Sequence, residues 1–528
     1  MATTQQQLPH GDSAGTFLGH PKGLFMLFFA EMWERFSYYG MRALLIFYLT
    51  KHWLYSDSEA GIIYGAYTAL VYITPVVGGY LADRYLGQRK AVLFGAVLLT
   101  LGHFFMAFEG DAGAGHTDNP VINVFWLALA LIIVGSGFLK ANISVIVGQL
   151  YPRTDVRRDG AYTIFYMGIN LGAALGSLLC GYIGETYGWA YGFGLAGVGM
   201  LAGLAVFVWG RPLLLGRGEP PAPLAKGREW TMYGVGLALV ALCWVLVQNQ
   251  AVVGWLLGGF GGALVLYVIG TAVTKLQPDE RDRIFAALFL IITSIVFWAL
   301  FEQAGSSLNL FTDRHVDRGG VPASVFQSIN AIYIILLAPV FATLWTLLGR
   351  KGMEPSTPFK FGLGVVQVGL GFLVLVWGAR SVGIDVPTPV IFIFLIYLLH
   401  TTGELCLSPV GLSAMNRLAP AHMASLIMGV WFFASATGNF AAGLIAAATG
   451  AEAVGEEAGK QVVLDVYSTV GWVAIGVGVF VLVISPLIKR LMHLDTLRDD
   501  DVGDDLLGQS QGPREPEGAG IHPATRPQ

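Results

Sequence analysis

Apolar segments long enough to cross a bilayer alternate with short polar stretches along almost the whole chain. A membrane-spanning helix needs about 20 consecutive, mostly apolar residues. The pattern predicts fourteen such helices, near residues 24–52, 59–82, 90–109, 121–149, 161–184, 190–210, 231–250, 253–274, 284–311, 322–349, 360–380, 388–416, 422–449 and 465–488.

The composition places the chain in the same class. Of its 528 residues 55% are hydrophobic and only 12% are charged, whereas about 25% are charged in soluble domains. We therefore expect an all-α polytopic membrane protein. Cys180, Cys243 and Cys406 lie singly within apolar segments, so we expect no disulfide framework, metal site or redox cofactor.

The distribution of basic residues predicts the orientation. With the N-terminus in the cytoplasm, 23 of the 31 Lys and Arg residues fall in cytoplasmic segments, 5 fall outside, and Arg35, Arg42 and Lys140 fall within spans. Such an excess of basic residues on one side is typical of the cytoplasmic face. An even number of spans then leaves both termini in the cytoplasm, and we expect a multi-pass protein of the inner cell membrane.

Two halves of six helices account for twelve spans. The predicted parts are a cytoplasmic tail at 1–23, a six-helix bundle at 24–211, a linker with two accessory helices at 212–283, a second bundle at 284–493 and a disordered cytoplasmic tail at 494–528. Pro75-Val76 before Gly87-Gln88-Arg89-Lys90 resembles Pro339-Val340 before Gly349-Arg350-Lys351, which suggests a parallel repeat. The accessory spans carry almost no ionisable residues, so they are expected to face lipid.

Ionisable residues within the first span are the strongest functional signal. Glu31, Glu34, Arg35, Tyr38 and Arg42 fall in one stripe about 100° wide if the segment is helical. Charges in a bilayer are costly and usually line a cavity or pair with one another. We expect this stripe to form a cavity wall; a salt bridge that only stabilises the fold is the alternative.

Three further buried ionisable residues extend the candidate site. Lys140 in the fourth span could pair with Glu31 or Glu34, while Glu302 and Glu404 have no basic partner in their own helices. A carboxylate in such surroundings is suited to proton transfer. Pro409, five residues after Glu404, offers a hinge. His103 and His400 are expected to be hydrogen-bonded core residues.

Polar and aromatic residues at helical spacing are expected to line the same cavity. With Glu302, Trp298, Ser306 and Asn309 fall within one stripe. The other positions are Tyr166, Asn170, Asn330, Trp431, Ser435 and Asn439. With cations on the first half and acids on the second, such a cavity would hold the two ends of a zwitterion, and its apolar walls would accept varied side chains.

Five sequence strings resemble the proton-dependent oligopeptide transporter family, a branch of the major facilitator superfamily. They are E-x-x-E-R-F-x-Y-Y-G from Glu31, FYMGINLG from Phe165, FEQAGSSL from Phe301, QSIN from Gln327 and GELCLSPVGLS from Gly403. The resemblance implies the major facilitator fold, with two six-helix bundles and, as in bacterial members, two helices between them. It also implies a symporter that imports di- and tripeptides with protons by alternating access.

Residue roles follow from this resemblance. It assigns Glu31, Glu34, Arg35 and Glu302 to proton coupling, Arg42 and Lys140 to the peptide carboxylate, and Glu404 with Asn330 to the peptide amine. It assigns Tyr38, Tyr39, Tyr72, Asn170, Trp298, Trp431 and Ser435 to the pocket. The loop GGYLADRYLGQRK, with Asp83 and Arg84, resembles the latch on the inner face of the superfamily. Asp57 with Arg314, or the nearby Arg318, is expected to form an outer gate.

Other functions remain open at this stage. A proton-coupled carrier of nitrate, another small anion or an amino-acid-like solute is the main alternative, because relatives that carry nitrate keep the E-x-x-E-R string. The spans contain no pattern of an intramembrane hydrolase, so we expect no enzyme. The expected partners are peptides, protons and membrane lipid, with no nucleic acid and no obligate protein. Gly65 stands where animal members have a proton-linked histidine, so coupling here cannot depend on that residue.

Overall fold

The computed structural model describes residues 15–110, 116, 119–151, 155, 157–450 and 456–494. Thirteen helical segments in this part of the chain are long and apolar enough to cross a membrane. Helix α1, with 26 residues, is also long enough to cross a membrane, but it carries several charged side chains. Together they make the fourteen predicted spans. The predicted tails lie largely outside the described residues.

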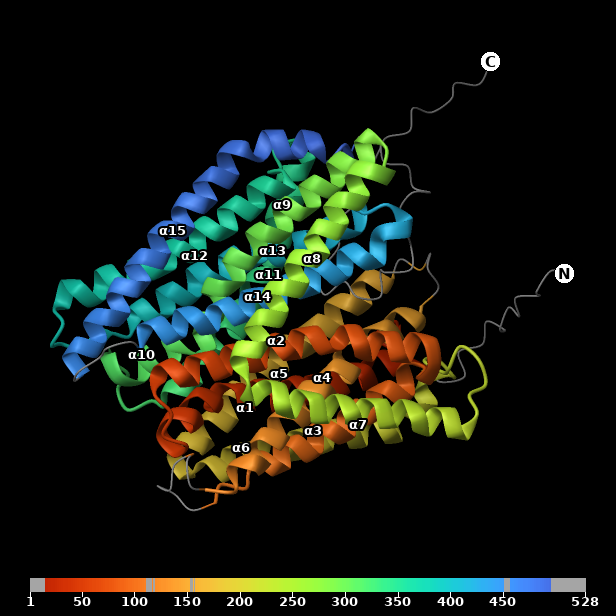
Figure 1. Ribbon diagram of the computed structural model, residues 1–528, viewed down its shortest axis with the longest axis horizontal. Coiled ribbons are helices and arrows are strands. Elements are labelled where there is room, and N and C mark those ends of the chain that lie inside the picture. Colours follow the sequence, from red (N-terminus) through yellow and green to blue (C-terminus); the bar gives the residue numbers. More distant parts are fainter. Residues whose placement is uncertain are drawn as a thin grey trace.

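Six long helices form the first half, in the lower layer of Figure 1. They are α1 (Lys22–Phe47), α2 (Asp57–Leu81), α3 (Gln88–Met106), α4 (Ile122–Gln149), α5 (Arg157–Tyr187) and α6 (Trp189–Trp209). Short turns of η1 (Tyr48–His52) and η2 (Ala82–Leu86) extend α1 and α2, and η3 (Arg211–Leu214) follows α6. A small antiparallel hairpin of β1 (Thr16–Phe17) and β2 (His20–Pro21) precedes α1.

The second half forms the upper layer of Figure 1. Its elements are α9 (Pro278–Phe301), η4 (Glu302–Gly305), α10 (Ser307–His315), η5 (Ala323–Gln327), α11 (Ser328–Arg350), α12 (Thr357–Val382), α13 (Ile391–Leu418), η6 (Ala421–Met423), α14 (Ala424–Thr449) and α15 (Glu456–Leu491). Strands β3 (Val316–Asp317) and β4 (Thr388–Pro389) pair in parallel. Pro75 lies in the second long helix of the first half and Pro339 in that of the second, as the proposed repeat requires.

Two corrections to the predicted boundaries concern the second half. The segment predicted as one helix at 284–311 begins at Pro278 and is interrupted by η4. The earlier start follows from a capping box between Gln277 and Glu280, which compensates the free backbone groups of the charged first turn. Helix α15 likewise begins at Glu456, before its apolar part.

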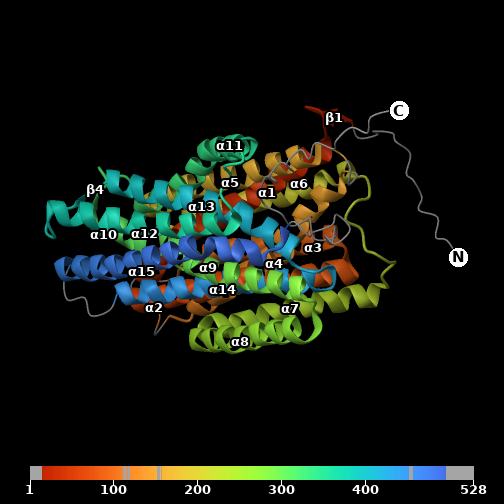
Figure 2. The same ribbon diagram turned by 90° about the horizontal axis from the view of Figure 1, so that it is seen from above.

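The accessory helices α7 (Lys226–Gln248) and α8 (Gln250–Lys275) form a hairpin at the side of the molecule (Figure 2). Most of their apolar side chains are exposed, among them Trp255 and Phe260, which in a membrane protein means contact with lipid. The start of α8 packs into the hydrophobic cluster of the first half, whereas Val268 and Ala272 near its end belong to the cluster of the second half. The hairpin therefore contacts both halves.

Candidate functional site

A cavity of about 210 Å³ lies between the two halves, near the middle of the helices. It collects residues that are far apart in sequence, from α1, α2, α4 and α5 on one side and from α9, η4, α11, α13 and α14 on the other. Its charged lining residues are Glu31, Arg35, Arg42, Lys140, Glu302 and Glu404. Six of the seven buried charges singled out in the sequence thus face one space.

Helix α1 supplies one wall of this cavity. Arg35 Nε lies 3.0 Å from Glu31 Oε1 and 2.5 Å from Glu34 Oε2, and all three side chains are almost fully buried. The predicted pairing within the E-x-x-E-R string is therefore present. Because Arg35 contacts both glutamates within a single helix, this cluster does not depend on contact between the two halves.

The wall is rotated relative to the predicted stripe. Glu31, Arg35, Tyr39 and Arg42 line the cavity, but Glu34 does not. At 100° per residue, these four positions are centred about 50° away from the centre of the predicted stripe. The predicted stripe overlaps the face of α1 that lines the cavity, but the rotation of α1 about its axis is set by packing against neighbouring helices.

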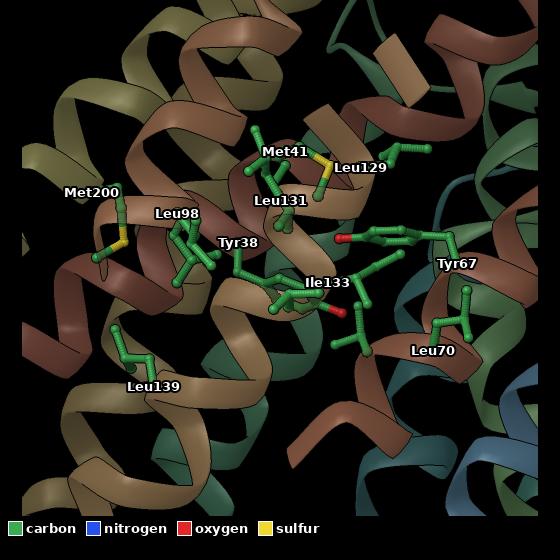
Figure 3. Packing of buried hydrophobic residues seen from close by; sticks show 14 of the residues in the cluster. Tyr38, Met41, Tyr67, Leu70, Leu98, Leu129, Leu131, Ile133, Leu139 and Met200 are labelled. Carbon is green, nitrogen blue, oxygen red and sulfur yellow. The ribbon is translucent and has the colours of Figure 1, made fainter. Parts of the chain in front are cut away.

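Tyr38 also lies outside the cavity, contrary to the prediction. It is 3% exposed and belongs to the hydrophobic cluster of the first half. Figure 3 shows it among aliphatic side chains, with Tyr67 and Ile133 nearby. We therefore remove Tyr38 from the pocket and regard it as a packing residue.

The two halves meet at Arg42 and Glu302. The Arg42 guanidinium donates to the Glu302 carboxylate, and its Nε donates to Tyr64 Oη at 2.6 Å. Glu302 begins the turn η4, and Gly305 in that turn lies directly against Tyr64, where a β-carbon would be 1.8 Å from the hydroxyl oxygen. The helix break and this glycine allow the second half to approach α1 and α2 closely enough for the ion pair.

Lys140 is the cation of the cavity without an ion pair. Its Nζ lies 4.6 Å from the centre of the Tyr72 ring, a cation–π contact. No carboxylate of the described chain lies within 4.0 Å of it, so the predicted direct pairing with Glu31 or Glu34 is absent. An anionic group of a solute is therefore a suitable partner for this ammonium group.

Glu404 is held by an amide group, and among the described residues it forms no ion pair with a cation. Asn330 Nδ2 donates to Glu404 Oε2 and to Thr401 Oγ1, both at 3.0 Å. This brings together the two residues predicted for an amine end. Pro409 lies within α13, which continues past it to Leu418.

The remaining predicted pocket residues divide into two groups. Those that line the cavity are Tyr39, Tyr72, Tyr166, Asn170, Trp298, Trp431 and Ser435. Those that do not line it are Ser306, Asn309 and Asn439. Ser306 and Asn309 were placed by assuming a continuous helix, which η4 interrupts, and Asn309 instead donates to the carbonyl of Ala43 at 3.1 Å.

The histidines also differ from expectation. His400 lines the cavity rather than only the core. His103 is fully buried, but neither of its ring nitrogens has a hydrogen-bond partner in the described structure.

Sequence reasoning missed several lining or supporting residues. The most important are Tyr64, Thr401, Gln327 and Tyr397. Tyr64 could have been found, because Tyr64, Thr68 and Tyr72 recur every four residues along one face of α2. The others carry no such signal.

On the side of the α1–α2 loop the halves are joined by further ion pairs. Arg314 binds Asp57 through two contacts, one of them at 2.8 Å between Nη2 and Oδ1. Lys51 Nζ lies 2.7 Å from Asp313 Oδ2. The predicted contact of Asp57 is with Arg314; Arg318 instead binds Asp313. These contacts between the halves close this face of the molecule.

The predicted inner latch has different contacts from those expected. Asp83 accepts a hydrogen bond from Gln88 Nε2 at 2.8 Å, and neither Asp83 nor the exposed Arg84 forms an ion pair with another described residue. The basic residues of the same loop bind the linker: Arg89 pairs with Glu219 and Lys90 with Glu229. The loop thus contacts the accessory hairpin rather than the second half.

Two six-helix halves, a charged cavity between them and a closed face on one side define a secondary membrane transporter of the major facilitator type. A sequence profile described as the POT family matches residues 89–460, and the chain belongs to this family.

Relatives and solved structures match over most of the chain. The peptide transporter YePEPT of Yersinia enterocolitica is 38% identical over 81% of this chain and 88% of its own length. The di-/tripeptide transporter of Lactococcus lactis strain IL1403 is 35% identical over 80% and 88%. A crystal structure of the peptide transporter POT with alafosfalin is 37% identical, covers 91% of this chain and 97% of its own, and has a TM-score of 0.79.

Proposed function

We propose that the protein is a symporter that imports di- and tripeptides together with protons by alternating access. The names of its relatives support peptides as the substrate class, since they include a peptide transporter and a di-/tripeptide transporter. The membership of the POT family supports transport rather than catalysis. The remaining argument comes from the charges of the cavity.

The observation that carries the proposal is the separation of charge between the halves. Arg42 and Lys140 belong to helices of the first half, whereas Glu302 and Glu404 belong to the second. A free peptide at neutral pH carries a carboxylate at one end and an ammonium group at the other. Bound with its carboxylate near Lys140 and its amine near Glu404 and Asn330, it would link the two halves and favour their closure.

The number of charges supports the coupling to protons. The cavity and the wall of α1 beside it hold four carboxylates, of Glu31, Glu34, Glu302 and Glu404, and three cations, Arg35, Arg42 and Lys140. Because a net charge within a membrane is costly, this set is most stable with one carboxylate protonated. A zwitterionic peptide does not change the balance, so one proton would accompany it.

Glu302 is the carboxylate best placed to hold that proton. In the closed-face structure its carboxylate accepts from the Arg42 guanidinium, which also donates to Tyr64. Protonation would remove one partner of a buried ion pair, a change that typically costs several kcal/mol. The contact between the halves would then open, and Arg42 would become available for the peptide carboxylate.

The proposed orientation has both termini in the cytoplasm and the closed face outside. The side of α15 at which the described chain ends is also the side at which α9 begins, since His493 Nε2 lies 3.4 Å from Asp282 Oδ2. The many basic residues on this side support its assignment to the cytoplasm of an inner-membrane protein.

The test uses the purified protein in proteoliposomes that contain a pH-sensitive dye. An inward gradient of dialanine should acidify the lumen, because each peptide would carry at least one proton. Nitrate at the same concentration should leave the lumen pH unchanged. Acidification by nitrate but not by dialanine would favour the anion carrier, and dialanine uptake without a pH change would contradict proton coupling.

A further inference from the structure

A second cavity lies where α6 ends and the linker to α7 begins. It encloses about 330 Å³ and is lined by Arg89, Arg211, Arg217 and Glu219, together with Pro212, Leu214 and Gly216. It is separate from the central cavity, with which it shares no lining residue.

The turn that forms this cavity is anchored to the first half. After η3 the chain reverses through Leu215, Gly216 and Gly218, with φ angles of 52°, 76° and 77°. The Gly218 carbonyl accepts from the backbone N–H of Arg89 at 2.9 Å, and the Gly218 N–H donates to Gln149 Oε1 at 2.9 Å. These bonds join the linker to the start of α3 and the end of α4, so they fix the backbone next to Arg217 beside that of Arg89 before any ligand binds.

The cavity has an excess of positive charge and of hydrogen-bond donors. Glu219 compensates Arg89 through a contact of 2.9 Å. The guanidinium groups of Arg211 and Arg217 have no hydrogen-bond or ion-pair partner in the described chain, and the buried Arg89 Nε also lacks one. Several guanidinium groups with free donors around one space are suited to a phosphate group, which accepts paired hydrogen bonds.

Two tryptophans indicate the depth of this cavity in the membrane. Trp209, the last residue of α6, is 81% exposed, and Trp230 at the start of α7 is 72% exposed. Exposed tryptophan at the ends of membrane helices is typical of the headgroup region. Arg211 and Arg217 lie between these two residues in sequence, which favours a position near the headgroup region for both. Leu215, about half exposed, provides an apolar surface beside them.

We propose that this cavity binds the phosphate of an anionic phospholipid headgroup. In the proposed orientation it faces the cytoplasmic leaflet, where anionic lipids attract basic side chains. The lipid would be held between α3, the end of α6 and the linker, next to the loop that carries Asp83 and Arg84.

Titration of the full-length protein with phosphatidylglycerol, followed by native mass spectrometry, tests the proposal. The double variant Arg211→Gln/Arg217→Gln should bind this lipid at least about tenfold more weakly than the unaltered protein, because two charge-assisted contacts are lost. Phosphatidylcholine should bind all variants equally weakly. The matched control is Arg228→Gln/Lys275→Gln, which removes two exposed charges from the same face outside the cavity and should bind like the unaltered protein.

A third variant gives an effect of opposite sign. Glu219→Gln removes the carboxylate that occupies Arg89, so phosphatidylglycerol should bind several-fold more tightly. Equal affinity in all variants, or the same loss in the control, would overturn the proposal. Inorganic phosphate that binds as tightly as phosphatidylglycerol would overturn the lipid assignment and identify a soluble anion as the ligand.

Discussion

At the scale of single residues, the ion pair between Arg42 and Glu302 joins the two halves, and in the proposed mechanism protonation of Glu302 would break this contact. Both side chains are buried, and Tyr64 holds the arginine in place. This contact across the halves is the reason for testing Glu302 as the proposed coupling residue.

Glu302→Gln mimics the permanently protonated state. We expect this variant to lose peptide accumulation driven by a pH gradient while it still exchanges labelled for unlabelled peptide across the membrane. Counterflow and gradient-driven uptake in proteoliposomes measure the two activities. Asp465→Asn, which alters an exposed carboxylate of α15 paired with Arg380, is the control and should retain both. Accumulation against a gradient by Glu302→Gln would show that another group carries the proton.

Lys140 should contribute through the peptide carboxylate. Lys140→Ala should lower kcat/KM for dialanine by at least about tenfold, because an ionic hydrogen bond is lost. For the unaltered protein, amidation of the peptide C-terminus should cause a similar loss. The two changes together should cost little more than either one, since both remove the same contact. Fully additive losses would show that Lys140 and the carboxylate do not interact.

At the scale of helices, α2 and α14 pack against each other across the two halves with glycine facing glycine. A β-carbon at Gly65 would lie 2.6 Å from the Cα of Gly443, and one at Gly443 would lie 2.7 Å from that of Gly65. This gives a physical reason for glycine at position 65, where animal members of the family have histidine. In the closed-face structure there is no space for a side chain.

Gly65→Ala should therefore destabilise the closed face. We expect a shift of the population towards the state open on that side, with reduced uptake at saturating peptide. Distances between spin labels placed on the α1–α2 loop and after α10 would measure the shift. Gly262→Ala in α8, where a β-carbon meets no atom within 4 Å, is the control. An unchanged distance distribution in Gly65→Ala would mean that the two helices can separate without cost.

At the scale of the whole molecule, ion pairs between the two bundles contribute to the closed face. The pair of Asp57 and Arg314 is partly exposed, with 25% and 39% of the side chains accessible. Such a pair is usually worth less than about 1 kcal/mol. In a transporter balanced between two states, that amount still changes their ratio several-fold.

A charge swap tests this contact. Asp57→Arg should slow peptide uptake, because it places two arginines together when the face closes. Adding Arg314→Asp should restore much of the rate by re-forming the pair in reverse. Initial rates at constant pH gradient measure both effects. If the double variant is slower than either single variant, the two residues do not act as a pair.

The sequence by itself determined the class of the protein, the number of helices and most of the residues that face the cavity. These properties depend on the length of apolar segments and on the cost of a charge in lipid, both of which are local. Glu31, Arg35, Arg42, Lys140 and Glu404 could therefore be identified from their positions within spans.

The tertiary structure decided which of these residues are in contact and how each helix is rotated towards the cavity. In the folded protein Tyr38 and Glu34 lie outside the cavity. Arg42 pairs with Glu302, 260 positions away in sequence, and Gly65 packs against Gly443. The rotation of a helix and its distance from a partner depend on side chains of segments hundreds of residues away. That information is contained in the packing of the two halves and not in any one stretch of sequence.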